Sequence, residues 1–323
     1  MADIAPMKTV DEAVKVEFTV ANAPADFVAP VMAELLPSQK APPDDMDRSS
    51  MLRYLPSMCA DALATDGQAI TLVSNAWNLY YRAAHLLDAI EDGDTLKDHW
   101  ANQSNGVTIN AAIGMMTSAS LMLNRLELLH IDPDVAQAIR AEFDRTVLAM
   151  CAGQHRDLTA QYPSLDQCWQ IARAKSGTFF GLACRATALA AGASPATVEH
   201  LGTFGQHLGL LIQILDDLSD LSPAVGVRSD LQQPHGCTLP MAYAMEVLSD
   251  DMREVLERAH ADASQDVDAE VTAREIIIQQ GALVYLSVEA HRCHHIAVDA
   301  LEHAVAPSPA RTTLRHVLDM FLV

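Results

Sequence analysis

Two clusters of acidic residues, far apart in the chain, have the side-chain types and the spacing needed to hold divalent cations. They comprise Asp88, Glu91 and Asp92 in the first, and Asp216, Asp217 and Asp220 in the second. Each cluster has aspartates at i and i+4, which places two carboxylates on one face of a helix, one turn apart. Mg²⁺ prefers oxygen ligands and commonly bridges a few carboxylates to substrate phosphates. Together the clusters indicate Mg²⁺-assisted chemistry on a diphosphate.

The elements that position these carboxylates are predicted to be long helices. Of the 323 residues, 50% are hydrophobic, and the Ala-, Leu- and Met-rich stretches contain few helix breakers. This composition favours an all-α chain. We expect helices over 25–36, 51–64, 68–92, 104–130, 134–160, 164–192, 195–221, 238–260, 267–303 (with room for a break) and 308–321. They fit a single large antiparallel bundle with metal ligands projecting inward from facing helices.

Local signals mark several boundaries. Ser194 followed by Pro195 is typical of a helix start, and Gly192 suits the end of the preceding helix. The stretch 37–50 is rich in Pro and charge, which predicts a loop. We therefore predict a weakly ordered segment with a short helix over 1–50 and one helical domain over 51–323.

Charge and cysteine content restrict the partners and the compartment. The formal net charge is −21 and no basic patch is evident, so nucleic acid is not an expected partner. The six cysteines form no Cys-x-x-Cys pair, which argues against a zinc ribbon or a disulfide framework and favours free thiols in a reducing, cytoplasmic environment. No signal peptide is evident. We expect no transmembrane segment, on the premise that no uncharged apolar run reaches about 18 residues.

Six short motifs, in order along the chain, resemble those of the trans-prenyl diphosphate synthases. They are Asp88–Asp92, in which Ala89 replaces the second Asp of a DDxxD motif; Gly106–Asn110; Gly153-Gln154 with Asp157; Lys175-Ser176-Gly177; Gly209–Asp220; and Thr238-Leu239-Pro240. Each motif alone is weak, whereas six in the right order are specific. The resemblance runs from about residue 49 to the C-terminus. It implies the class I isoprenoid synthase fold, a helical bundle around a central apolar cavity.

The resemblance also implies a set of metal ligands, all of them carboxylates. They are Asp88 and Asp92 for two Mg²⁺ ions, Asp216 with Asp220 for a third, and Glu91 and Asp217 as secondary ligands. Three such ions would neutralise the charge that develops on a departing diphosphate.

The same resemblance implies how a prenyl diphosphate would be held. Lys175, with Lys97 or Arg53, would hold the diphosphate by charge-assisted hydrogen bonds, and Gln213 would belong to the same site. With the end aspartates of the two clusters, Lys175 completes the expected catalytic set. A homodimer is the assembly that the resemblance implies.

The chain departs from the family where elongating members bind a second substrate, isopentenyl diphosphate. The Gly-Lys-x-x-Arg segment of the family falls on Ser49, Ser50 and Arg53, its His on Tyr81, and its Arg-Arg pair on Lys97 and Asp98. The negative charge at Asp98 opposes a diphosphate by about 1 kcal/mol even in a high dielectric. Ionisation residues are thus kept while acceptor residues are lost. We therefore expect a terpene cyclase that ionises one prenyl diphosphate and lets the carbocation cyclise or be quenched.

Small and aromatic residues before the first cluster predict the depth of the pocket. Ala84 stands where bulky residues stop short chains in the family, and a small residue there admits longer ones. Tyr80, Tyr81 and Trp77 follow deeper along the helix and would form the floor. We expect a substrate of about C20, with C15 second.

Three other functions stay open. The first is a chain-elongating prenyltransferase of the geranylgeranyl or farnesyl diphosphate synthase type, with an altered isopentenyl diphosphate site. The second is a head-to-head condensing enzyme, against which the Gly153-Gln154 and Thr238-Leu239-Pro240 segments argue. The third is a non-catalytic partner subunit, against which the survival of both end aspartates in each cluster argues.

A group of histidines near the C-terminus is a weaker candidate site. His291, His294 and His295 have a spacing that could bind zinc. No acidic or thiol residue completes a strong signature, so a helix face or a partner contact is the preferred interpretation.

Overall fold

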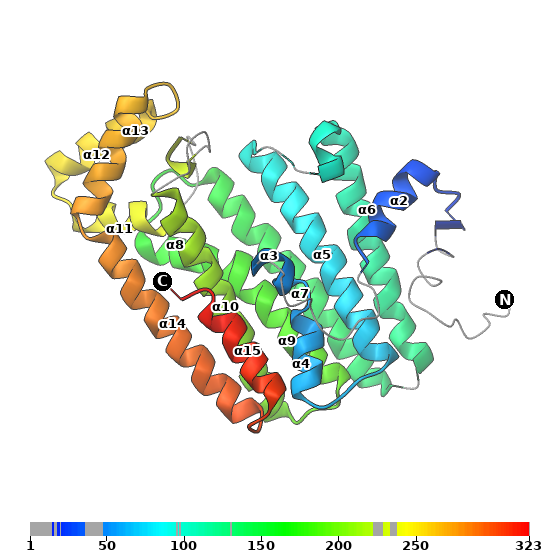
Figure 1. Ribbon diagram of the computed structural model, residues 1–323. Helices are drawn as coiled ribbons and strands as arrows, with labels where there is room; N and C mark the ends of the chain where they lie inside the picture. Colours follow the sequence, from blue (N-terminus) through cyan, green and yellow to red (C-terminus); the bar gives the residue numbers. More distant parts are fainter. Residues whose placement is uncertain are drawn as a thin grey trace. The chain divides into compact units, whose positions relative to one another are not determined.

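The part of the chain that the structure describes is mostly helical. The computed structural model describes residues 15, 18–19, 21–35, 48–94, 96, 98–129, 131–221, 229–232 and 238–322. These residues form α-helices, short 3₁₀ turns and a π-helical turn, with no β-strand among them (Figure 1). The all-α class predicted from the sequence is confirmed.

Contacts within the chain divide it into two compact units. Unit 1 comprises Met1–Asp144, Ala183–Glu199 and Ala304–Leu314, and unit 2 comprises Arg145–Leu182, His200–His303 and Arg315–Val323. Several helices therefore contribute residues to both units. Neither unit is delimited at residue 50, and the domain boundary expected there stays a prediction.

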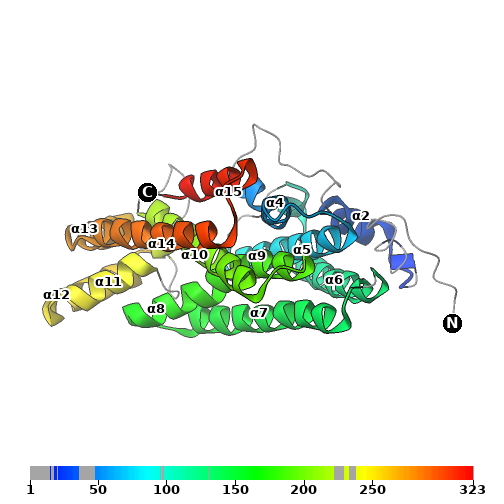
Figure 2. The ribbon, with the colours of Figure 1, turned by 90° about the horizontal axis from the view of Figure 1, so that it is seen from below.

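Unit 1 is built around α5 (Gln68–Asp92) and α6 (Asn105–Asn124), which lie side by side (Figures 1 and 2). Every residue from Leu72 to Tyr81 is buried, so this stretch of α5 is surrounded by protein on all sides. The unit also contains α2 (Ala25–Ala33), α3 (Arg48–Leu52), α4 (Leu55–Ala62), η1 (Asp98–Asn102), η2 (Arg125–Leu129) and parts of α7 (Pro133–Thr159), α9 (Thr178–Ala190) and α10 (Pro195–Asp220).

Unit 2 holds the C-terminal part of α10 in an apolar core. Leu221, directly after α10, is buried in a cluster with Leu256 and Ile277. This packing fixes the end of the helix that carries the second acidic cluster. The unit also contains the end of α7, the start of α9, α8 (Leu165–Ala172), η3 (Arg173–Gly177), η4 (Asp230–Gln232), α11 (Leu239–Val247), α12 (Asp250–Asp262), α13 (Val267–Gln279), α14 (Ala282–Ala304) and the end of α15 (Pro309–Asp319).

Two helix breaks qualify the sequence prediction. The helix predicted over 238–260 is wrong as a single element, because Leu248 takes an extended conformation with ψ of 149° and α12 starts two residues later. Asp250 and Asp251 in the first turn of α12 are the local signal for this second helix start. The break within 267–303 falls at Gly281, whose φ of 89° strains any residue with a Cβ.

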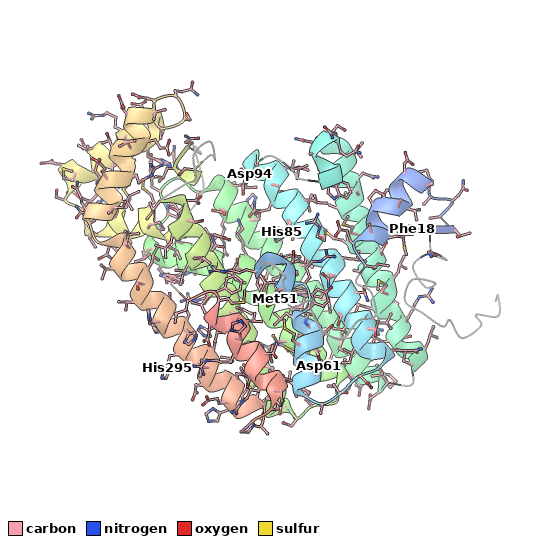
Figure 3. All side chains as sticks on the ribbon, in the orientation of Figure 1. Phe18, Met51, Asp61, His85, Asp94 and His295 are labelled. Atoms are coloured by element: carbon pink, nitrogen blue, oxygen red, sulfur yellow. The ribbon has the colours of Figure 1, made fainter. Side chains whose placement is uncertain are left out.

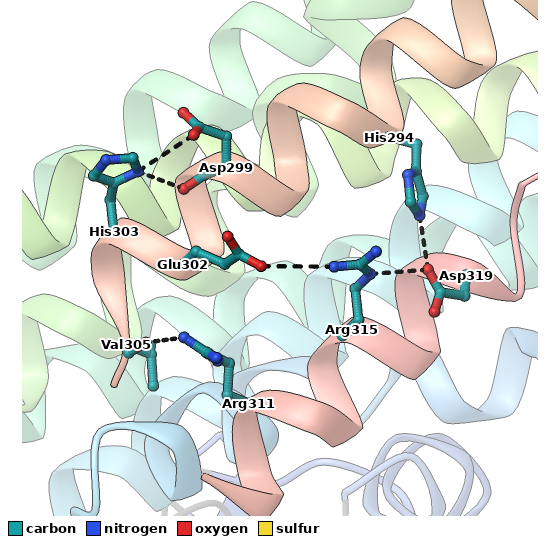
Figure 4. Close-up of polar contacts among 8 residues, drawn as sticks. All are labelled: His294, Asp299, Glu302, His303, Val305, Arg311, Arg315 and Asp319. Carbon is teal, nitrogen blue, oxygen red and sulfur yellow. Dashed lines mark hydrogen bonds and ion pairs between the residues drawn. The ribbon is translucent and has the colours of Figure 1, made fainter. Parts of the chain in front are cut away.

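Polar contacts tie α15 to α14 within unit 2 (Figure 4). His294 Nε2 lies 2.7 Å from Asp319 Oδ1, and Arg315 Nε donates to the same oxygen at 3.1 Å. Arg315 also pairs with Glu302. Within the described ranges, no three His, Cys, Asp or Glu side chains are grouped to hold a metal. The structure therefore gives His294 a contact between helices.

The cysteines differ in part from the prediction. Cys59, Cys151, Cys184 and Cys293 are free thiols. Cys168 is disulfide-bonded. The expectation of free thiols throughout is therefore wrong for Cys168, because the absence of a Cys-x-x-Cys pair does not exclude a bond between distant residues.

The premise behind the absence of a membrane span also needs correction. Asn105–Leu129 is one helical stretch long and apolar enough to cross a membrane, judged by length and composition alone. A core helix passes the same test, and α6 buries Ala112, Met115 and Ala119 while packing along α5. The stretch is therefore weak support for a membrane span.

Candidate active site

The first acidic cluster forms the last turn of α5. The helix ends at Asp92, and its last turn carries no basic residue. Asp88 and Glu91 are exposed and Asp92 is half-buried; His85 and Asp94 bracket the cluster along the chain (Figure 3). A carboxylate at a helix C-terminus meets the negative end of the helix dipole and costs about 0.3–1 kcal/mol. A bound cation would remove this cost.

The second cluster occupies the equivalent position at the end of α10. This helix ends at Asp220, again with no basic residue in its last turn. Asp216 is exposed, Asp220 is half-buried and Asp217 is buried. The outer two aspartates thus share the electrostatic setting of the first cluster, whereas Asp217 differs.

Both carboxylate oxygens of Asp217 accept hydrogen bonds from the protein. Gln213 Nε2 donates to Oδ1 at 2.9 Å, and the backbone N–H of Leu239 donates to Oδ2 at 2.7 Å. Leu239 is the first residue of α11, so Asp217 satisfies a donor at a helix N-terminus, where negative charge is favourable. The predicted role of Asp217 as a secondary metal ligand therefore competes with two observed bonds.

Gln213 links two of the sequence motifs, Lys175-Ser176-Gly177 and Gly209–Asp220, through hydrogen bonds. Its Oε1 accepts from Ser176 Oγ at 2.9 Å, while its Nε2 donates to Asp217. Both ends of this amide are thus engaged within the protein. This chain of hydrogen bonds, the relay from Ser176 through Gln213 to Asp217, occupies the Gln213 amide. The sequence prediction placed Gln213 against the substrate.

Lys175 lies in a π-helical turn and is held by Asp157. The turn η3 (Arg173–Gly177) interrupts the run from α8 to α9, and such turns are frequent at functional sites. Lys175 Nζ donates to Asp157 Oδ2 at 2.7 Å, with both side chains half-buried. Asp157 therefore fixes the direction in which the ammonium group points.

Two motif glycines let neighbouring helices approach the π-helical turn closely. A Cβ at Gly153 of α7 would lie 2.9 Å from Ala174 Cβ. A Cβ at Gly209 of α10 would lie 2.8 Å from the carbonyl carbon of Ser176. Real Cβ atoms essentially never come so near, so glycine is required at these crossings for steric reasons.

The aromatic residues of α5 are buried where a pocket floor was predicted. The Tyr80 hydroxyl lies 3.0 Å from Ser120 Oγ of α6, and its ring lies against Phe143 at 5.7 Å between centroids. Tyr81 stacks on Trp77 at 5.2 Å. Successive helical residues point about 100° apart, so Tyr80 and Tyr81 occupy different sides of α5. The floor itself stays a prediction.

Replacing Tyr80 or Tyr81 by Ala should shift the substrate preference toward longer prenyl chains. Ala84 is half-buried, so removing a ring beyond it would extend the space along α5. Chain-length preference is measured with C15, C20 and C25 diphosphates. Tyr80→Phe is the control, because it removes the bond to Ser120 but keeps the ring. An unchanged preference in both alanine variants would contradict the predicted floor.

The predicted diphosphate ligand Arg53 is engaged with other parts of unit 1. Its Nε donates to Asn78 Oδ1 at 3.0 Å, and its Nη2 donates to the backbone oxygen of Glu34 at 2.7 Å. Lys97, the alternative ligand, lies outside the described residues, as do the side chains of Ser49 and Asp98.

Comparison with known proteins identifies the family. Residues 55–277, more than half of the chain, match the polyprenyl synthetase family. The chain belongs to this family. Geranylgeranyl diphosphate synthase from Mycobacterium tuberculosis is 28% identical over 264 residues, covering 77% of this chain and 71% of that protein. This polyprenyl synthetase family member spans about half the length of other curated relatives that it matches.

Solved structures of the same fold cover nearly the whole chain. A polyprenyl synthetase from Streptomyces coelicolor A3(2) has a TM-score of 0.76 and 23% identity, over 97% of this chain and 95% of that one. A geranylgeranyl pyrophosphate synthase from Corynebacterium glutamicum, complexed with calcium and isoprenyl diphosphate, has a TM-score of 0.71 and 21% identity, over 97% and 93%. At these identities the likeness shows the fold alone, and the predicted isoprenoid synthase fold is confirmed.

Three residues that bond to predicted site residues have no role in the sequence prediction: Asp157, Ser176 and Glu34. Asp157 and Ser176 stand inside recognised motifs, so their position was the available signal. Glu34 had no such signal, because it precedes the loop over 37–50 and its partners lie on other elements.

Proposed function

We propose that this polyprenyl synthetase family member is a Mg²⁺-dependent prenyltransferase that ionises an allylic prenyl diphosphate and joins the prenyl group to isopentenyl diphosphate. The observation that carries the proposal is the family match over 55–277, with an acidic cluster at the end of both α5 and α10. Relatives named by the comparison make geranylgeranyl and nonaprenyl diphosphate. These relatives support chain elongation better than the cyclisation expected from the sequence.

The residues at the two helix ends fit Mg²⁺. Asp88, Asp92, Asp216 and Asp220 offer hard oxygen donors at helix termini where a cation is favourable. Mg²⁺ is often held by one or two carboxylates plus substrate phosphates, so a preformed group of three protein ligands is not required. When bound, Mg²⁺ would act as a Lewis acid toward the leaving diphosphate. We propose three such ions.

The remaining residues would position the substrate. Lys175, oriented by Asp157, would donate to oxygens of the leaving diphosphate and stabilise the charge that develops there. The relay from Ser176 through Gln213 to Asp217 would keep the π-helical turn and the end of α10 in register. The buried rings of α5 would exclude water from the prenyl cation.

Cyclisation of a single substrate is the second candidate, favoured by the state of Arg53 and Tyr81. Arg53 is bonded to Glu34 and Asn78, and Tyr81, which stands where elongating members have a His, is stacked on Trp77. Both observations reduce the donors available to isopentenyl diphosphate.

A product assay separates the candidates. The protein is incubated with geranylgeranyl or farnesyl diphosphate and Mg²⁺, with and without isopentenyl diphosphate. A longer diphosphate formed only with both substrates is the result we expect. A hydrocarbon or alcohol formed from one substrate would replace elongation by cyclisation. No turnover with either allylic diphosphate would favour a partner subunit.

We also propose a homodimer as the assembly. Ile109 and Ile113 lie one turn apart on α6 and are exposed. An apolar stripe on a long helix supports contact with a second copy.

A further inference from the structure

One buried carboxylate in unit 1 is shared by two arginines. Glu34 Oε2 lies 3.0 Å from Arg82 Nε and 3.4 Å from Arg53 Nη2. The Glu34 side chain is only 8% exposed, and those of Arg53 and Arg82 are 25% and 23% exposed. Two half-buried guanidinium groups therefore meet on a single buried carboxylate.

This group carries more positive than negative charge. Two arginines and one glutamate leave a net charge of +1 in a half-buried place, where charges are poorly screened. Burial lowers the pKa of Arg53, Glu34 raises it and Arg82 lowers it again. The guanidinium nevertheless stays protonated, because arginine is not deprotonated in proteins. An anion with more charge than one carboxylate would balance the group better.

The arginine side of the group is rigid. Asn78 of α5 is fully buried, accepts from Arg53 Nε and donates to the Arg53 carbonyl at 2.8 Å. Arg82 lies one turn further along the same helix. Glu34 lies at the C-terminal end of the short helix α2. The backbone carbonyl oxygen of Glu34 accepts a hydrogen bond from Arg53. Arg82 thus lies within the long α5 and Arg53 is bonded to it through Asn78, whereas Glu34 lies at the end of the nine-residue α2.

We infer that Glu34 is a specificity-determining residue: its carboxylate occupies an anion site formed by Arg53 and Arg82 and competes there with a diphosphate group. The inference rests on the proposed function in that diphosphates are the substrate class. Arginine forks suit phosphate oxygens, which carry more charge than a carboxylate. A diphosphate enters this site only by displacing Glu34. Acceptor binding is therefore weakened by the chain itself.

The test is pyrophosphate binding to the full-length protein by calorimetry, with EDTA present to remove divalent cations. Glu34→Gln should bind inorganic pyrophosphate about tenfold tighter or more than the wild type, and the gain should shrink as salt is added. Asp26→Asn is the matched control, because Asp26 is an exposed acid on the same helix. It makes the same change in net charge and should leave affinity within about twofold.

Two further variants test whether the added pyrophosphate binds at Arg82 and whether the reach of the Glu34 carboxylate matters. Adding Arg82→Gln to Glu34→Gln should abolish the gain, and a gain that persists would place the anion elsewhere and overturn the inference. Glu34→Asp keeps the charge but shortens its reach, and it should give an intermediate gain even if Glu34→Gln fails to fold. If folded Glu34→Gln binds pyrophosphate with the affinity of the wild type, the inference is overturned. If Glu34→Gln does not fold, the same result in Glu34→Asp overturns it.

Isopentenyl diphosphate provides the second arm and separates this inference from the proposed function. In Glu34→Gln, its KM in the elongation assay should fall by about tenfold with kcat little changed. If the wild type elongates and Glu34→Gln changes neither the pyrophosphate affinity nor the KM for isopentenyl diphosphate, the inference is wrong and the proposed function stands. If Glu34→Gln binds pyrophosphate more tightly but the protein elongates no substrate, the inference stands and the proposed function is wrong.

Discussion

Replacing Asp88 by Asn should lower the rate of diphosphate release roughly 10²- to 10³-fold. Activity falls because a carboxylate proposed to hold Mg²⁺ is lost. Asp88 sits in the last turn of α5, where its charge opposes the helix dipole by about 0.3–1 kcal/mol, and the change removes that cost. Steady-state kinetics and thermal unfolding without metal measure the two effects.

A matched control separates the loss of charge from the loss of a ligand. Asp262 is an exposed carboxylate that ends α12, outside both clusters. Asp262→Asn makes the same electrostatic change at a helix C-terminus and should leave the rate unchanged. If Asp88→Asn were as active as the wild type, or clearly less stable, the first cluster would be a structural feature.

Replacing Asp217 by Ala should destabilise unit 2 severely. The change removes the acceptor for the Leu239 N–H, which is left buried, and for the Gln213 amide, which is left half-buried. The expected loss is about 3–5 kcal/mol in the free energy of unfolding, and a fall of roughly 10 °C in melting temperature. Thermal unfolding followed by circular dichroism measures it.

Asp217→Asn serves as the graded control for this prediction. It keeps the shape and one acceptor oxygen, so we expect roughly half of the loss. The competing hypothesis is that Asp217 is a metal ligand. An unchanged melting temperature in Asp217→Ala, with activity abolished, would support that hypothesis against the structural role.

The helices were largely predictable because their signals are local. Residues 68–92 form the predicted helix to the residue, and Ser194 accepts from the Thr197 N–H as an N-cap should. Gly192 has the positive φ, 67°, expected at a helix end. Periodicity and capping act over a few residues, so one sequence contains them.

The ordered motifs also predicted the family from the sequence. They did not predict which partners each motif residue bonds to. The prediction that favoured a cyclase followed from missing acceptor residues, whereas the comparisons favour chain elongation. Ser49 and Asp98 show that two acceptor-binding side chains of the family are absent. The sequence does not show which other side chains occupy the space that they leave.

The all-α class, most of the helices and the acidic ends of two of them could be predicted from the sequence alone. The bond of Asp217 to the first residue of α11, the approach of Gly209 to the π-helical turn and the pairing of Glu34 with Arg53 and Arg82 became visible only once the segments were packed together. The physical reason is range. Helix propensity depends on neighbours within a turn, whereas the partner of a buried charge depends on which distant segments pack around it.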